Sequence, residues 1–441
     1  MQRAVALLAL ICVRQLTGTE EVLTLDHAIS LALQANRLIL SSGLEVKKFD
    51  EQLAATRTRR LPVINWYALG SQRLTDVNFH FDQGVFGIFP GIGPIPGKNT
   101  TIRTPLKPAA LLLGRIDQPL SQQYGIGLGL HQQALGRDSA REQERAQRQS
   151  VVNSVKRAYY EILQTQSALE SVEKSIELYK ELDRLTEQYV DQQVALKSDS
   201  LEVKMRLAQA EYNVLALRNP LATQKEHLNS LLGRDIQVEF RVAPAEEARW
   251  TDTDLAAARR LALEQRPEIR QARLKVEQAE YDRRSKKAEY IPNLSLSFNY
   301  ISPVNFGSLI PSNIAMAGLL LDWEPFDWGR KKHELAQKTY LVQQAQLRLR
   351  ETQDQIAIEV NSKYRKLQET RQLLVIAHLG QETAREKLRV VKNRFSQQAS
   401  LLKDVLQVQT SLADADNQYQ QALLNFWSAK ADYEQALGED Q

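Results

Sequence analysis

The chain has almost no cysteine, which excludes two kinds of stabilised fold. Cys12 is the single cysteine among 441 residues, so neither a disulfide framework nor a cysteine-based zinc site can form. The six histidines are scattered, and none stands in an HExxH motif or another metal-ligand spacing. We therefore expect no metal site and no cofactor.

An excess of charge of one sign is also lacking. Lysine and arginine total 57 against 53 for aspartate and glutamate, a net charge of +4, which is too balanced for a dedicated nucleic-acid binder. Walker A, GxSxG and helix-opening GxGxxG motifs are absent, so we expect no catalytic residue and no enzyme. Gly125, Gly127 and Gly129 alternate with apolar residues, which predicts a strand or loop there.

Proline and glycine are missing from two long stretches. Residues 137–219 contain neither, and residues 330–437 contain only Gly380. Because proline breaks helices and glycine weakens them, these stretches predict long helices or helical hairpins. Apolar residues recur in them at nearly the spacing of a coiled-coil seam. An intracellular coiled coil would show the same seam, so that alternative stays open.

The N-terminus has the pattern of an export signal. Residues 1–18 begin with a positive charge at Arg3, continue through the apolar residues 4–13 and end in small residues at Gly18. Such a segment is typical of a secretory signal peptide and is too short to span a membrane. A frayed apolar N-terminus is the alternative. No later apolar run reaches the roughly 20 residues of a membrane-spanning helix.

The sequence repeats itself. Residues 31–70 align with residues 261–300. Later segments of the two halves also align, and Tyr159 with Tyr364 is one example of a matched pair. The first repeat carries an insertion between about 70 and 120, where proline and glycine concentrate, and we expect a surface loop there. The expected division is a signal peptide at 1–18, a first repeat at 19–233 (short helix 25–60, strand pair about 62–120, long helical hairpin 125–233), a linker at 234–252 and a second repeat at 253–441 (short helix 253–290, strand pair about 292–325, long helical hairpin 329–438).

Alternating side chains predict two strands in each repeat. Leu294, Leu296, Phe298 and Tyr300 alternate with polar residues, which indicates a strand at 293–301. The other predicted strands are 62–70, 110–118 and 314–323. Strands of this length can cross an outer membrane when tilted, although soluble hairpins packed on the helices would look the same. Six aromatic residues near their ends could lie at the membrane interfaces: Trp66, Tyr67, Phe298, Tyr300, Trp323 and Trp328.

Two tandem copies of short helix, strand pair and long hairpin resemble the TolC family of outer-membrane efflux proteins. The residues that carry the resemblance are Leu31-Ala32-Leu33-Gln34-Ala35-Asn36, Leu261-Ala262-Leu263-Glu264-Gln265-Arg266-Pro267, Leu61-Pro62, Ile291-Pro292, Trp323-x-Pro-Phe-Asp-Trp-Gly329, Ala158-Tyr159-Tyr160, Asp404-Val405-Leu406, Leu232-Gly233 and Leu437-Gly438. The resemblance implies a mostly α fold with a small β part. Three protomers would form a periplasmic α-barrel and, with four strands each, a shared 12-stranded outer-membrane barrel.

The resemblance also assigns roles to the two hairpin turns. The turns near residues 192–198 and 397–403 would be periplasmic tips, where the channel narrows. Asp404 aligns with the family's acidic pore position, Asp199 is its repeat mate, and Gln407 stands one turn further on. A ring of carboxylates would favour cations, whereas an N-cap of the following helix would explain either aspartate equally simply.

Apolar residues at the same turns suit the docking of an adaptor protein, or ordinary turn packing. With the polar residue Ser400 included, these residues are Val194, Ala195, Leu196, Ala399, Ser400 and Leu401. The tip glycine of relatives is replaced by Gln398, and Phe395 and Ser400 stand where some relatives have a Tyr and an Arg. A polar latch of that kind is therefore not expected here.

The function implied is an outer-membrane exit duct for tripartite efflux or type I secretion, with a large periplasmic portion. Its partners would be two further copies of the chain, outer-membrane lipid, a periplasmic adaptor and an inner-membrane pump, with no nucleic acid. The alternative is a periplasmic coiled-coil tether without a pore. The strand pairs distinguish the two, because a tether has no need of them.

Overall fold

The computed structural model describes residues 21–72, 74–104, 106–244, 254–305, 311–397 and 399–439. The expected signal peptide, the linker beyond residue 244 and Gln398 lie outside these residues. The chain divides into two compact units, one of residues 1–47, 138–274 and 347–441, and the other of residues 48–137 and 275–346.

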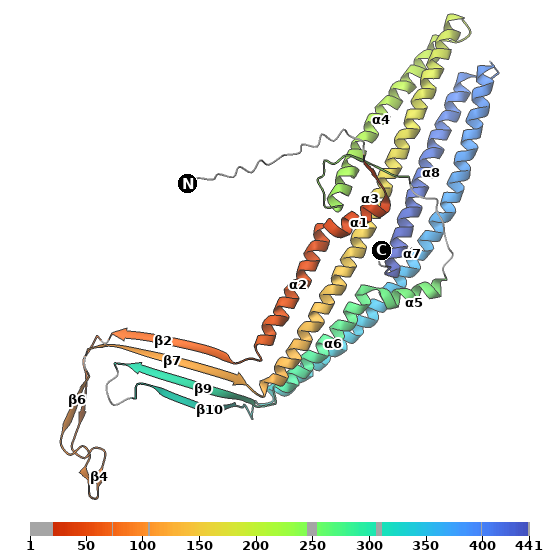
Figure 1. Ribbon diagram of the computed structural model, residues 1–441. Helices are drawn as coiled ribbons and strands as arrows, with labels where there is room; N and C mark the ends of the chain where they lie inside the picture. The colour runs from red at the N-terminus through yellow and green to blue at the C-terminus, as the bar shows by residue number, and fades with distance from the viewer. Residues whose placement is uncertain are drawn as a thin grey trace, which may run out of the picture. The chain divides into compact units, whose positions relative to one another are not determined.

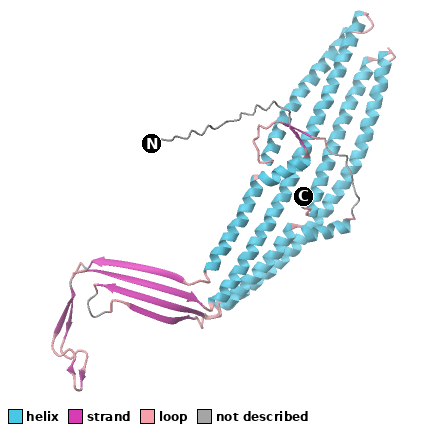
Figure 2. Ribbon diagram, viewed as in Figure 1, coloured by secondary structure: helices cyan, strands magenta, loops and turns pink. Residues whose placement is uncertain are grey.

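Helices dominate the described chain, and the strands are few (Figure 2). The expected mostly α fold with a small β part is therefore confirmed. The helices are α1 (Leu25–Ala35), α2 (Arg37–Thr58), α3 (Gln122–Asp191), α4 (Lys197–Leu231), α5 (Leu255–Gln265), α6 (Pro267–Ala288), α7 (Arg330–Ser396) and α8 (Leu402–Leu437). The strands are β1 (Glu21–Leu23), β2 (Val63–Gln72), β3 (Val77–Phe81), β4 (Ile88–Phe89), β5 (Gly93–Pro94), β6 (Thr100–Thr104), β7 (Pro108–Pro119), β8 (Phe240–Val242), β9 (Asn293–Val304) and β10 (Ile314–Asp322).

Two antiparallel helical hairpins, α3–α4 and α7–α8, follow from the stretches without proline and glycine (Figure 1). Helix α3 has 70 residues and α7 has 67. Helix α3 begins before Gly125, so the prediction of a strand or loop through Gly125, Gly127 and Gly129 was wrong. Each glycine weakens a helix by only about 1 kcal/mol, which the hydrogen bonding of a long helix tolerates.

Each expected short helix is in fact two helices. The first breaks at Asn36 and the second at Arg266, and both residues have extended backbone angles. Arg266 precedes Pro267, which disfavours the helical conformation for the residue before it. At the first break the Asn36 side chain accepts a hydrogen bond from Leu38 N at 2.9 Å and so starts the next helix.

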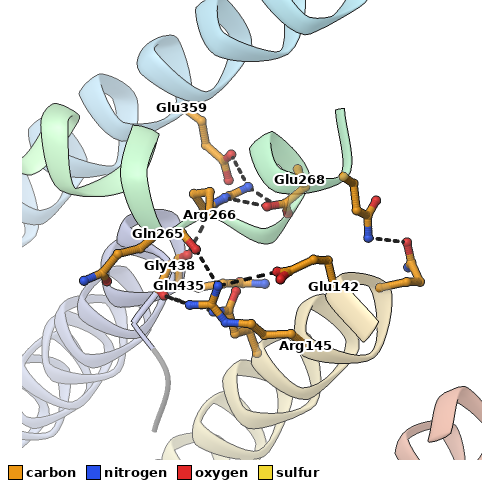
Figure 3. Close-up of polar contacts among 11 residues, drawn as sticks. Glu142, Arg145, Gln265, Arg266, Glu268, Glu359, Gln435 and Gly438 are labelled. Carbon is orange, nitrogen blue, oxygen red and sulfur yellow. Dashed lines mark hydrogen bonds and ion pairs between the residues drawn. The ribbon is translucent and has the colours of Figure 1, made fainter. Parts of the chain in front are cut away.

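Each break is joined to the end of a long hairpin. Asn36 Nδ2 donates to Leu231 O, the last residue of α4, at 2.7 Å. At the second break Arg266 Nη1 lies 3.3 Å from Gln435 O near the end of α8, and Arg266 also pairs with Glu268 and Glu359 (Figure 3).

The junction at the second break has a further cross-link. Arg145 of α3 donates to Gln265 O at 2.7 Å and to Gly438 O at 3.3 Å (Figure 3). One guanidinium thus satisfies carbonyl groups at the C-terminal ends of two helices, which have no partner within their own helix.

The main core of the first unit lies around Tyr159. Its hydroxyl lies 3.0 Å from Leu23 O and 2.8 Å from Ala243 O, next to the short parallel pair β1–β8. Val155 and Ile162 on the same helix are fully buried beside it. Burial raises the pKa of Tyr159 to about 12, despite the opposing hydrogen bond to Ala243.

The second unit contains a four-stranded antiparallel sheet in the order β10-β9-β7-β2 (Figure 1). The four predicted strands are thus confirmed. Within the described residues, the outer edge of β2 and the outer edge of β10 pair with no other strand.

The insertion is more regular than the loop we expected. Strands β3 and β6 pair as a ribbon over Val77–Phe81 and Thr100–Thr104, and β4 pairs with β5 beyond it. Apolar and polar residues alternate in β3, and Ile102 of β6 pairs with its central Phe79, a pattern that the surrounding prolines and glycines hide.

Candidate functional sites: the sheet and the hairpin tips

One face of the four-stranded sheet is apolar. The register places Trp66, Gly114, Tyr300 and Ala315 in one row across the four strands. The row on one side of it holds Ile64, Ile116, Phe298 and Ala317. The row on the other side holds Ala68, Leu112 and Ser302, and the row beyond Ile116 holds Gln118, Leu296 and Leu319. In the single chain much of this face is open to solvent. An exposed apolar face of this kind marks a surface that contacts another protein or a membrane.

The opposite face is polar near the strand ends that join the helices, whereas its next row holds Tyr67, Leu113 and Ile301. Asn65, Arg115 and Asn299 form one row, and Asp117 and Ser297 lie in the next. Arg115 Nε pairs with Asp117 Oδ2 at 2.6 Å across this face. An apolar face backed by a polar face is the pattern of a strand between lipid and a water-filled lumen.

The predicted interfacial aromatic residues fall into three groups. Trp66 and Tyr300 meet edge to face at 6.4 Å, with Phe298 on the same side of the sheet. The contact depends on Gly114, because a Cβ atom there would lie 2.7 Å from the Trp66 ring. Tyr67 points to the opposite side.

The other two predicted aromatic residues, Trp323 and Trp328, are exposed and follow β10 rather than belonging to it. Trp328 meets Phe326 edge to face at 4.7 Å. Asp327 accepts hydrogen bonds from Gly329 N and Lys331 N, and these bonds start α7.

The two hairpin tips, residues 192–196 and 397–401, share one backbone hydrogen bond. In the first tip Val194 N donates to Tyr189 O at 2.8 Å, and in the second Ala399 N donates to Arg394 O at 2.8 Å. These residues align in the repeat. Leu196 and Leu401 are each 70% exposed at equivalent places.

Both tip aspartates bond to the backbone at the start of a helix. Asp199 Oδ2 accepts from Leu196 N at 3.2 Å, and Asp404 Oδ2 accepts from Leu401 N at 3.1 Å. The N-cap residues are Leu196 and Leu401, so the expected N-cap role is corrected: each aspartate is the third residue of its helix. A carboxylate at that position accepts a hydrogen bond from a backbone N–H that has no partner within the helix. Its negative charge is also stabilised by the positive N-terminal end of the helix dipole.

The two aspartates differ in exposure. Asp404 and Gln407 are exposed, whereas Asp199 is half-buried and the neighbouring Ser200 is buried. Asp404 therefore keeps a carboxylate surface available to solvent while it bonds to Leu401.

The predicted docking residues lie at the exposed ends of the tips. Val194, Leu196 and Leu401 are largely exposed, whereas Ala195 and Ser400 are half-buried. Ser400 Oγ donates to Val391 O at 3.3 Å, so it closes the turn rather than facing outward. Beneath the tips, Tyr189 and Phe395 meet edge to face at 5.9 Å and join the two hairpins.

Sequence reasoning missed two acidic residues of α8 that hold the hairpins together. Asp416 accepts hydrogen bonds from Ser171 of α3 at 3.0 Å and from Gln381 of α7 at 2.7 Å. Asp432 accepts from Asn153 at 3.1 Å and from Lys363 at 2.7 Å. In the sequence, each residue is one aspartate on a helix face whose other residues predict exposure to solvent. Such aspartates are too common to indicate a buried contact.

The ionisation of Asp432 is favoured by these partners. Burial by itself would raise its pKa, but the hydrogen bonds from Lys363 and Asn153 and the charges of Lys363 and Arg157 outweigh it, so the pKa is lowered. Asp432 is therefore an anion at neutral pH that bridges α3 and α7.

Two features are absent from the described residues. No group of three or more histidine, cysteine, aspartate or glutamate side chains there could hold a metal ion. None of the described helices combines the length and the hydropathy required of a membrane span.

A family match covers most of the second repeat. The sequence pattern of the outer membrane efflux proteins matches residues 258–439. These residues are therefore similar to that family. The alkaline protease secretion protein AprF of Pseudomonas aeruginosa is 26% identical over 163 residues, which is 35% of this chain and 33% of AprF. The match therefore spans about a third of that curated relative. The resemblance expected from the sequence is confirmed.

Solved structures extend the likeness in fold to nearly the whole chain. The outer-membrane channel OprN matches with a TM-score of 0.74 and 18% identity over 94% of this chain and 89% of its own. The CmeC outer membrane channel of Campylobacter jejuni matches with a TM-score of 0.75 and 15% identity, over 94% of this chain and 85% of its own. CusC matches with a TM-score of 0.75 and 16% identity, over 94% of this chain and 92% of its own. The chain therefore has the fold of these efflux family channels.

Proposed function

We propose that the chain is an outer-membrane exit duct for tripartite efflux or type I secretion, catalysing no reaction. The observation that carries the proposal is the sheet, whose apolar face backs a partly polar face and whose strands have 9–12 residues. Strands of about 9–11 residues cross a bilayer when tilted. A periplasmic tether without a pore would have no use for such a sheet.

The duct would be a homotrimer. Four strands cannot close a barrel, since the smallest transmembrane barrels have eight, and open edges do not occur in hydrocarbon. The unpaired edges of β2 and β10 would therefore pair between copies. Three copies give the 12-stranded barrel expected from the family resemblance, with Trp66, Tyr67, Phe298, Tyr300, Trp323 and Trp328 proposed near its membrane interfaces.

The helices support the same assembly. In the chain α8 packs on α3 through contacts such as Gln409 to Ser175 at 3.0 Å. The repeat mates of these helices are α4 and α7, and each has an exposed apolar stripe. The stripe of α4 holds Leu201, Met205, Tyr212 and Leu215, and that of α7 holds Leu373, Ile376 and Leu379. Packing of α4 on α7 of the next copy would repeat the α8–α3 contact and close a helical ring.

The tips would be the inner end of the duct. We assign the constriction to Asp404, with Gln407 and Asp199 nearby, and the docking of a periplasmic adaptor to Val194, Ala195, Leu196, Ala399, Ser400 and Leu401. An inner-membrane pump behind the adaptor would supply the energy. AprF, named for alkaline protease secretion, and the efflux channels of the same fold support this direction of transport.

The test is conductance of the purified protein in planar bilayers, together with its mass in detergent. A trimer with discrete conductance steps is expected. A monomer that keeps its full β content and gives no conductance would refute the duct.

A further inference from the structure

The first repeat carries a ribbon between its two sheet strands. Strand β3 begins five residues after β2 ends, and β6 ends four residues before β7 begins, so the ribbon continues directly from two strands of the sheet. In the second repeat β9 ends at Val304 and β10 begins at Ile314, and the residues described between them form no further strand. Each copy of the chain therefore carries one ribbon.

The two faces of the ribbon differ in chemistry. The register pairs Phe79 with Ile102 and Phe81 with Thr100 on one face, and His80 with Thr101 on the other. Asn78 and Arg103 share the polar face, where Thr101 Oγ1 and His80 Nδ1 lie 2.7 Å apart. We call the side with Phe79, Phe81 and Ile102 the apolar ribbon face.

The apolar ribbon face is open in the single chain. Phe79 is 51% exposed, and Phe86 packs on Phe81 at 5.2 Å to extend the face towards the β4–β5 end. There Ile88 is 78% and Ile92 is 75% exposed. A two-stranded ribbon is marginally stable unless its apolar face packs on something, so this face requires a cover.

A second copy of the chain is the cover that the sheet itself indicates. The ribbon continues from β2, whose outer edge is unpaired and needs another copy beside it. A copy at that edge carries its own ribbon at the same level. Tethering on one barrel rim gives the ribbons effective concentrations of about millimolar, so they meet each other before they meet a free partner.

We propose that the apolar ribbon faces of neighbouring copies pack against one another and close over the outer mouth of the duct. The proposal rests on the proposed function, because it requires copies side by side in one barrel. In this proposal the ribbon of the first repeat forms a gate at the outer end of the duct. The apolar residues of the insertion then make contacts between copies.

Two single-cysteine variants on adjacent residues test this directly. Both are made with Cys12→Ser, and Phe79→Cys places a thiol on the apolar ribbon face while His80→Cys places one on the polar face. After mild oxidation of outer membranes, Phe79→Cys is expected to give a covalent dimer, at least about fivefold more than His80→Cys, because effective concentration favours the facing pair. Two of three copies can join in this way.

A second measurement does not depend on cross-linking. Phe79→Glu places like charges on the packed faces, so the purified trimer should keep its mass and show a larger or longer-lived open conductance. Equal cross-linking of both cysteine variants in a conducting trimer would overturn this inference alone. A monomer without conductance would overturn the proposed function and this inference with it.

Other covers of the ribbon give distinct results. If Phe79→Cys reacts with a water-soluble maleimide in detergent but not in vesicles, and forms no dimer, lipid covers the face and the inference is overturned. A cross-link to a different protein in cells, with none between purified copies, also overturns it.

Discussion

A Cβ atom on Gly233 would lie 2.2 Å from the carbonyl oxygen of Ala35. Gly233 also has a φ of 72°, which residues with side chains rarely adopt. Its repeat mate Gly438 has a φ of 79° and approaches Arg266 N at 3.0 Å by the same measure. Each long hairpin thus ends in a glycine because its last turn touches the break between the two short helices.

Gly233→Ala is expected to destabilise the protein, by roughly 1–2 kcal/mol from the left-handed backbone alone and by more from the contact with Ala35. Gly380→Ala is the matched control, since it lies inside α7 with no atom within 4 Å of the added Cβ. The control should be neutral or stabilising by about 0.5–1 kcal/mol. Thermal unfolding of the two purified variants compares them, and equal melting temperatures would contradict the contact.

Phe298→Lys and Asn299→Lys distinguish the two faces of the sheet. The residues are adjacent on β9 but lie on the apolar and the polar face respectively. A lysine in lipid costs about 2–4 kcal/mol at the bilayer midplane, so Phe298→Lys should reduce membrane assembly, while Asn299→Lys should assemble and shift selectivity towards anions. Heat-modifiable migration on gels and reversal potentials measure the two effects. Equal assembly of both variants would mean that the sheet is not in lipid.

Asp404→Asn separates charge from hydrogen bonding at the second tip. The amide oxygen can still accept from Leu401 N, so the melting temperature should change little, while cation selectivity and block by multivalent cations should fall if Asp404 lines the constriction. Asp404→Ala should show the same change in ion flow and also lose about 0.5–1 kcal/mol of stability.

Asp199→Asn is the control at the first tip, where the half-buried carboxylate makes the same backbone bond. It should leave selectivity unchanged. If Asp404→Asn conducts like the unmodified protein, the aspartate serves only the helix, and Gln407 becomes the next residue to test.

Asp432→Asn should make the stability of the protein less sensitive to acid. The folded pKa of Asp432 lies below its usual 3.8, so its ionised form contributes stability above that pH, and the contribution is lost as the pH falls through the folded pKa. At neutral pH the substitution should cost about 1.5–3 kcal/mol, the range for a hydrogen bond to a charged group.

Melting temperatures at pH 7 and pH 3 provide the comparison for Asp432. The difference between the two pH values should be smaller in Asp432→Asn than in the unmodified protein. Lys363→Met removes the main cationic partner at 2.7 Å and should give a similar reduction. An unchanged difference in both variants would assign the acid sensitivity to other carboxylates.

Much of the architecture could be predicted because simple patterns dominate it. The stretches without proline and glycine form most of α3, α4, α7 and α8, although α4 continues through Pro220, and the alternation around Phe298 became β9. The break at Arg266 had a signal in Pro267, which we read as part of one helix. The break at Asn36 had almost none, because an asparagine within an apolar period fits a helix as well as a cap.

The candidate sites were harder to predict because they depend on pairings far apart in the sequence. Asp416 bonds to Ser171 and Gln381 on two other helices, and no local pattern marks such a triangle. The apolar ribbon face was hidden for a different reason. Its strands are five residues each, and the prolines and glycines around them suggest a loop.

The unpaired edges of β2 and β10 bear on how the protein reaches its membrane. A lone sheet with two open edges is insoluble in hydrocarbon, so no copy can insert by itself and wait for others. In the proposed trimer, insertion is then a collective step whose rate rises with more than the first power of protein concentration. A cell that makes little of this chain would leave a disproportionate share of it uninserted, and halving its synthesis would more than halve the number of ducts.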